Sequence, residues 1–185
     1  MHTMLKPHFR IAFTALVLLF VIAVLAREHL NGGVVTHHFM HRADMPGMSN
    51  WWSLLLLPAL SWFLVGRMQK RVTAESHRIF TSAKLPINVV LGFLAALAYG
   101  IALSAGFSFG YGNLTGYLFQ GLILVALLLP IYRAECLLGF VLGMSVVFGA
   151  MIPIVFGSLL AALSAFVHLV LWPALLRLGA WIKSR

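Results

Sequence analysis

Six long apolar runs constrain the fold of this chain more than any other feature of its sequence. A helix needs about 20 consecutive apolar residues to cross the hydrocarbon core of a bilayer. Runs near this length, bounded by charges, Gly, Pro or Asn, cover residues 10–26, 51–66, 86–107, 114–132, 135–152 and 157–177. The predicted fold class is therefore an all-α polytopic membrane protein, with six transmembrane helices in a single transmembrane domain over residues 1–185.

The composition excludes a soluble globular domain. Hydrophobic residues make up 62% of the chain, charged residues only 9%, and the mean hydropathy is +0.99. An ordinary soluble domain carries about 25% charged residues. The chain also has a single cysteine, Cys136, which excludes an internal disulfide framework and a Cys-based zinc cluster.

Positive charges fall almost entirely on one side of the predicted topology. The chain has 13 Lys and Arg against 4 Asp and Glu, a net charge of +9. Only Arg27 and Arg42 lie outside if the N-terminus is inside, and Glu28 and Asp44 neutralise them locally. The other eleven lie in cytoplasmic segments, as the positive-inside rule requires: Lys6, Arg10, Arg67, Lys70, Arg71, Arg78, Lys84, Arg133, Arg177, Lys183 and Arg185. We predict a multi-pass protein of the cell inner (plasma) membrane with both termini cytoplasmic, whose basic face meets the lipid bilayer rather than nucleic acid.

Three details of this topology follow from local sequence signals. The cytoplasmic segment 67–84 is predicted to be a linker between the second and third spans, and it is too short to form a domain. The break between the last two spans is predicted at Pro153 to Gly157, which makes the last hairpin tight. The first run, which follows Lys6 and Arg10 and ends at Ala26, has an alternative interpretation as a cleaved signal peptide. Cleavage would leave five spans in the same orientation.

Small side chains recur along one face of several predicted spans. In the third span they occur at every fourth position, and the fifth and sixth spans repeat the pattern in part: Gly92, Ala96, Gly100, Ser104 and Ser108; Gly139, Gly143 and Ala150; Gly157, Ala161, Ser164 and His168. Such stripes let helix backbones approach closely, which holds bundles together in lipid. We expect them to pack helices within the chain; the alternative is a subunit contact in a homo-oligomer.

The extracytoplasmic loop over residues 27–50 is rich in His and Met. Imidazole binds zinc and copper, and thioethers select reduced copper. If residues 36–42 are helical, His37 and His41 lie one turn apart on the same face. We interpret the histidines first as a solvated or structurally hydrogen-bonded cluster. One alternative is a transition-metal site (zinc or copper) built from His37, His38, His41, Met40, Glu28 and Asp44. The other is a sensor of external pH, since His changes charge between pH 5 and 8.

Two tryptophans follow this loop directly. Trp51 and Trp52 begin the second span at the outer interface, where indoles anchor helices in the headgroup layer. The alternative is that they line a ligand pocket beside the histidines. We also expect the outer-loop histidines to converge with the outer ends of the second, third and sixth spans on one site, with Gln120 as its polar floor.

Polar residues inside the predicted spans are candidates for a substrate path because they are costly in lipid. His168 lies about 16 Å into the sixth span if that span begins at Gly157. It shares a face with Ser164, and the alternative to a proton or substrate role is a structural histidine whose ring nitrogen Ser164 satisfies. Gln120 and Asn88 are lesser candidates. Glu135 is expected to cap the fifth span and to pair with Arg133 at the cytoplasmic face.

These features favour a transporter or channel for a small solute or ion. Its outer His, Met and Trp residues would form an entrance, metal site or pH sensor, and its substrate path would comprise His168, Gln120, Ser164, Trp51 and Trp52. The first alternative is a metal-dependent enzyme or metal-handling protein built on the outer His cluster. The second is a non-catalytic membrane assembly subunit. The sequence contains no complete catalytic motif of the nucleotide-binding or serine-hydrolase kind.

Overall fold

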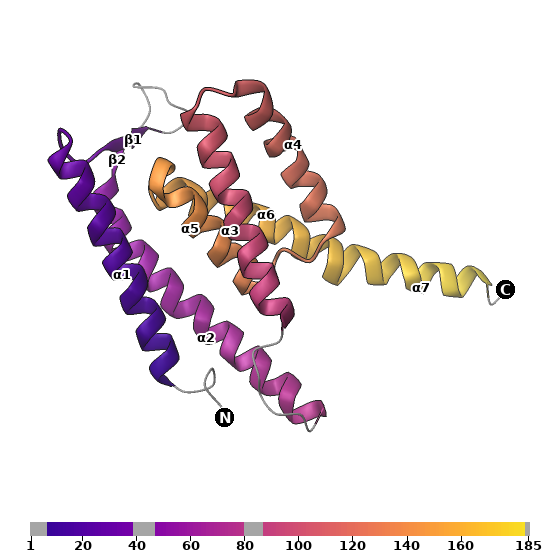
Figure 1. Cartoon of the computed structure of the whole chain (residues 1–185). Helices are drawn as coiled ribbons and strands as arrows, with labels where there is room; N and C mark the ends of the chain where they lie inside the picture. The colour runs from indigo at the N-terminus through magenta and orange to yellow at the C-terminus, as the bar shows by residue number, and fades with distance from the viewer. Residues whose placement is uncertain (1–6, 39–46, 80–86, 184–185) are drawn as a thin grey trace.

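The computed structural model describes residues 7–38, 47–79 and 87–183. Helices dominate, and a short antiparallel hairpin joins the first two of them (Figure 1). The order of elements is α1 (Pro7–Leu30), β1 (Thr36–His38), β2 (Gly47–Ser49), a 3₁₀ turn (Asn50–Trp52), α2 (Ser53–Ile79), α3 (Ile87–Ser108), α4 (Gly112–Leu128), α5 (Ala134–Phe148), α6 (Met151–Phe166), a π-helical stretch (Val167–Leu171) and α7 (Trp172–Lys183).

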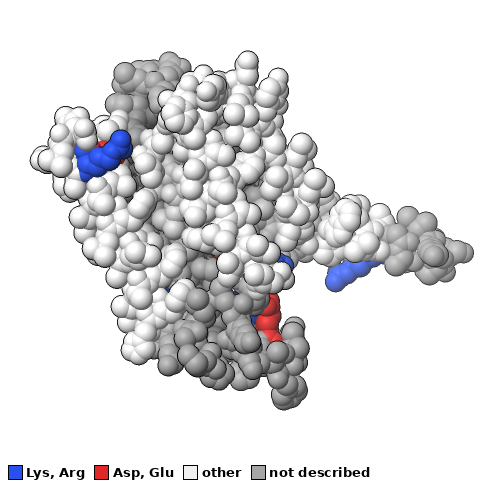
Figure 2. Space-filling view, in the orientation of Figure 1, with Lys and Arg blue, Asp and Glu red and all other residues white. Residues whose placement is uncertain are grey.

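Four helical stretches in the described residues are long and apolar enough to cross a membrane. They are His8–Leu30, Asn50–Glu75, Ile87–Ser108 and Met151–Leu178. The helices α4 and α5 are also apolar but shorter, with 17 and 15 residues. On the face shown in Figure 2, one group of charged side chains lies at the upper left and the others lie toward the lower right, including one on the projecting helix, with a broad surface without charge between them. These features place the chain among membrane proteins.

Helix α2 is longer than predicted, because the segment predicted as a linker is helical as far as Ile79. This stretch is free of Gly and Pro after Gly66. Its side chains also support the helix locally. Arg71 lies 3.8 Å from Glu75 one turn further on, and the Thr73 hydroxyl donates a hydrogen bond of 2.8 Å to the Gln69 carbonyl.

The break between α5 and α6 lies earlier than predicted. Helix α5 ends at Phe148, the next residue Gly149 has a positive φ of 65° that favours glycine, and α6 begins at Met151. Pro153 falls in the first turn of α6, where a missing N–H leaves no helical hydrogen bond unmade. The prediction of a break at Pro153 to Gly157 was wrong because this proline starts a helix instead of interrupting one.

The last long helix continues through a widened turn. The backbone N–H of Trp172 donates to the carbonyl of Val167, five residues back, and Pro173 follows immediately. A proline inside a helix removes one backbone hydrogen bond and crowds the preceding turn, and a π-helical turn is one way to accommodate such a disturbance. Helix α7 then extends away from the other helices (Figure 1).

Helix α5 forms the centre of the bundle and packs most intimately on α3. A Cβ atom at Gly139 or Gly143 would overlap backbone atoms of α3, namely the carbonyl oxygens of Phe93 and Leu97. The Ser104 hydroxyl of α3 donates a hydrogen bond of 3.2 Å to the Gly143 carbonyl. The small-residue stripes of the third and fifth spans therefore pack two helices of the same chain together.

The outer loop departs from the helical geometry considered for it. Residues 36–38 form strand β1, in which His37 pairs with Met48 of β2. The preceding Gly32 and Gly33 have φ near +115°, and Val34, Val35 and Thr36 are β-branched residues that favour extended backbone. One-turn helical spacing therefore does not bring His37 toward His41, and residues 39–46 lie outside the described part of the chain.

Candidate functional site

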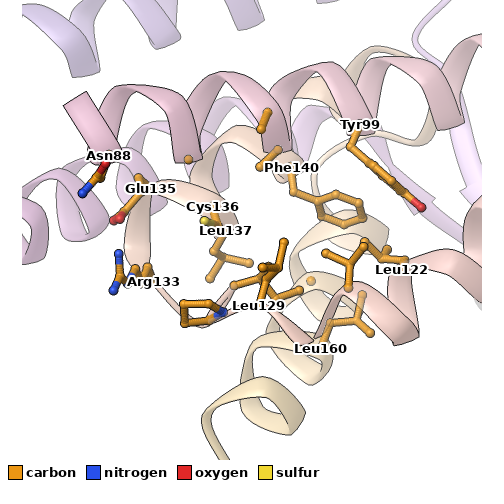
Figure 3. A pocket seen from close by; sticks show the side chains of 17 residues that line it. Asn88, Tyr99, Leu122, Leu129, Arg133, Glu135, Cys136, Leu137, Phe140 and Leu160 are labelled. Atoms are coloured by element: carbon orange, nitrogen blue, oxygen red, sulfur yellow. The ribbon is translucent and has the colours of Figure 1, made fainter. Parts of the chain in front are cut away.

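A cavity of about 400 Å³ lies between α3, α4, α5 and α6, beside the turn that joins α4 to α5. Its walls are mainly apolar, and Tyr99, Leu122, Phe140 and Leu160 line the part farthest from the charged groups (Figure 3). Gly157 contributes to the wall where α6 meets α5, and a Cβ there would crowd Leu137 and Phe140. The volume falls within the range of about 300–1,000 Å³ that is typical of small-molecule sites.

Polar groups gather at one end of this cavity. Figure 3 shows Asn88, Arg133 and Glu135 together there, with Cys136 next to Glu135 along the wall. Arg133 directly precedes α5 and Glu135 lies in its first turn. A carboxylate is favoured at this position because the helix dipole presents positive charge there.

Glu135 is the most deeply buried charged residue in the described structure. Its side chain is only 1% exposed, and Gly92 of α3 leaves the space that it fills, since a Cβ on Gly92 would come within 3.2 Å of the Glu135 Cγ. The Glu135 Oε1 accepts a hydrogen bond of 2.7 Å from Nη2 of Arg71 on α2. Within the described residues, the buried Oε2 has no hydrogen-bond partner.

The ion pair of Glu135 differs from the predicted one. Arg133 was expected as its partner because it is two residues away, but the described ion pair is with Arg71, which is 64 residues distant in sequence. Arg133 is exposed at the polar end of the cavity. The sequence marked Arg71 only as one of several cytoplasmic cations, and nothing in the spacing of α2 and α5 identified it as the partner of a buried acid.

His168 and Ser164 form a pair that holds the turn beside the cavity. The His168 Nδ1 lies 2.9 Å from the Ser164 carbonyl oxygen, which accepts a hydrogen bond from it, and the Ser164 hydroxyl donates to the Leu129 carbonyl at 2.9 Å. The ring of Tyr132 lies 6.2 Å from the His168 ring, centroid to centroid. Because α6 begins at Met151, His168 lies about 25 Å along that helix and not at the expected 16 Å. Its position beside the turn follows from this shift.

The other residues of the predicted path do not join this pair. Gln120 is exposed on α4 and does not line the cavity. Trp51 and Trp52 are 57% and 56% exposed in the 3₁₀ turn before α2, and they do not line the cavity. Asn88, which was a lesser candidate, does line the cavity.

At the hairpin end of the bundle, Glu28 anchors a chain of hydrogen bonds. Its Oε1 accepts from the Asn50 amide at 2.6 Å and its Oε2 from the Val35 backbone N–H at 3.2 Å. The Ser53 hydroxyl donates to the Asn50 side-chain oxygen and accepts from the Ala150 backbone N–H at 3.0 Å. Both carboxylate oxygens of Glu28 therefore already have partners in the described structure.

The predicted metal site remains a prediction. Met40, His41 and Asp44 lie outside the described residues, as do the side chains of His37 and His38. Within the described part of the chain, no three His, Cys, Asp or Glu side chains lie close enough to hold a metal ion. Below the hairpin, residues of α1, α2 and α5 with Asn50 line a cavity of only about 10 Å³, which is about the size needed for one water molecule.

Comparison with known protein families, with curated proteins and with solved structures finds no match to this chain.

Proposed function

We propose that this protein is a membrane transporter for a small, partly apolar solute, and that the cavity between α3, α4, α5 and α6 is its substrate site. The observation that carries this proposal is a cavity of about 400 Å³ that ends on the buried carboxylate of Glu135. Ionisable residues within membrane segments are costly and characteristically mark substrate or ion pathways. The polar groups occupy one end of the cavity, which favours a carrier site over a continuous aqueous pore.

The proposal includes six spans with both termini in the cytoplasm of the inner membrane. Helices α4 and α5 are about 25 and 22 Å long, somewhat short of the hydrocarbon thickness of about 30 Å. Helix α5 is shielded by its neighbours, so its short length exposes little backbone to lipid. With the charge distribution in the sequence, the polar end of the cavity then opens toward the cytoplasmic side.

Transport into proteoliposomes tests this function. We would measure uptake of two radiolabelled amphiphiles that cross bilayers slowly, hexylguanidinium and hexanesulfonate, because the cavity offers both a carboxylate and an arginine at its polar end. At least one should be taken up faster than by protein-free liposomes. N-ethylmaleimide should block this uptake by attaching to Cys136, which lines the cavity and is the only cysteine in the sequence.

The Cys136→Ala variant is the matched control, since it should transport the same probe and resist the maleimide. Equal uptake with and without the protein for both probes would contradict the transporter function. Uptake by the wild type that is insensitive to N-ethylmaleimide, despite complete labelling of Cys136, would place transport elsewhere than in this cavity.

A further inference from the structure

One oxygen of the buried Glu135 carboxylate has no hydrogen-bond donor among the described residues. Oε1 is bound by Arg71 at 2.7 Å, whereas Oε2 is buried without a partner in the described part of the chain. A buried charge with an unsatisfied oxygen is unfavourable unless a donor reaches it. The terminal torsion of a Glu side chain is broad, so the carboxylate can turn toward a donor placed in the cavity.

The charges around Glu135 favour a positively charged donor. Arg71 is shared between Glu135, at 2.7 Å, and Glu75, at 3.8 Å, so it compensates the buried carboxylate only in part. Arg133 also lines this end, but it is exposed, so water and salt screen its charge more than that of the buried acid. An N–H bond on a cation is also the stronger partner for a carboxylate.

The remaining walls define the rest of the ligand. Beyond the polar end, the cavity is lined by side chains such as Leu122, Phe140 and Leu160 (Figure 3). A ligand that fills it must bury an apolar body against them. We infer that the cavity binds a small amphiphile with a cationic, N–H-bearing head group, an ammonium or guanidinium, whose head group binds Glu135 and whose apolar part packs between α4, α5 and α6. This inference rests on the proposed function for its site and names the class of substrate.

Cys136 provides a direct reporter of binding that does not depend on transport. It lines the cavity beside Glu135, so a bound amphiphile should slow its alkylation by N-ethylmaleimide in reconstituted protein. We expect hexylguanidinium to protect Cys136. Hexyltrimethylammonium, which has the charge but no N–H, should require an about tenfold higher concentration for half-protection, and hexanesulfonate should not protect.

Two variants locate the head group. Glu135→Gln should raise the half-protecting concentration of hexylguanidinium about tenfold or more, because a charge-assisted hydrogen bond is lost. Glu75→Gln is the matched control, because it removes the other carboxylate beside Arg71 and residue 75 does not line the cavity. This variant should change the half-protecting concentration less than about threefold, as expected of an exposed charge. The alkylation rate of Cys136 with ligand is divided by the rate of the same variant without ligand, since the charge at residue 135 affects the reactivity of the thiol itself.

Each outcome decides the inference. Equal or better protection by hexanesulfonate, or unchanged protection in Glu135→Gln, would overturn the cationic class. If Glu135→Gln fails to elute as a folded protein on gel filtration, the order of the three head groups on the wild type decides alone. Protection by hexylguanidinium without uptake of either probe would contradict the transporter and leave the ligand class standing. Uptake of hexanesulfonate alone would support the transporter and contradict the ligand class. Absence of protection by any probe would contradict the ligand class.

Discussion

Burial of Glu135 depends on residues of three helices. The residue is carried by α5, given space by Gly92 of α3 and paired with Arg71 of α2. A buried ion pair contributes little net stability, but removal of one partner strands a charge away from water. The energetic consequence therefore depends on which side of the pair is changed.

Removal of Arg71 should be strongly destabilising. We expect Arg71→Met to lower the free energy of unfolding by about 3 kcal/mol, because it leaves the carboxylate of Glu135 buried and uncompensated. The measurement is a reversible SDS titration in mixed micelles. The double variant Arg71→Met with Glu135→Leu should recover most of the loss, and a double variant as unstable as the single one would contradict this explanation.

At the hairpin end, Asn50 bridges two elements through its side chain. It is buried, donates to Glu28 and accepts from Ser53. Asn50→Ala should lower the free energy of unfolding by about 2 kcal/mol, since it removes two hydrogen bonds and leaves the buried Ser53 hydroxyl without its acceptor. Asn113→Ala, on an exposed position of α4, should change the same titration by less than about 0.5 kcal/mol. Similar losses in the two variants would show that the bridge contributes no specific stability.

At the scale of elements, the contact between α3 and α5 depends on the absence of side chains. Gly139→Ala should lower the free energy of unfolding by about 1–3 kcal/mol, because its Cβ would overlap the backbone of α3 and force the helices apart. Gly116→Ala on α4 has open space around it and should be neutral or slightly stabilising, as expected for Ala in a helix. The mixed-micelle titration should therefore show a loss of stability for Gly139→Ala and none for Gly116→Ala.

The positions of the helices were predictable from the sequence, because runs of apolar residues define them locally. Consecutive apolar residues locate the described helices, four of which are long and apolar enough to cross a membrane. Their ends were less predictable: Pro153 signals a helix start as readily as a break, and the charged segment after Gly66 continues as helix. The pairing of Arg71 with Glu135, and the cavity beside it, arise only when distant helices pack together, so no local pattern in the sequence specifies them.

At the scale of the whole molecule, the proposed topology places the hairpin and the end of α2 on opposite sides of the membrane. In a Cys136→Ala background, a membrane-impermeant maleimide should label Asn31→Cys in intact cells. It should label Glu75→Cys only after the membrane is permeabilised, because the positive-inside rule assigns the basic end of α2 to the cytoplasm. Both positions are exposed in the structure. Labelling of Glu75→Cys in intact cells would invert the orientation.

The hydrogen bond from the Ala150 backbone to Ser53 has a mechanical consequence. Ala150 follows the last turn of α5, and Glu135 lies in the first turn of the same helix. Helix α5 is thus held at both ends. The network that begins at Glu28 holds its C-terminal end, and the salt bridge to Arg71 holds its N-terminal end. A displacement of the hairpin would reach Ser53 through Glu28 and Asn50, and so act on the end of α5 opposite to the buried acid.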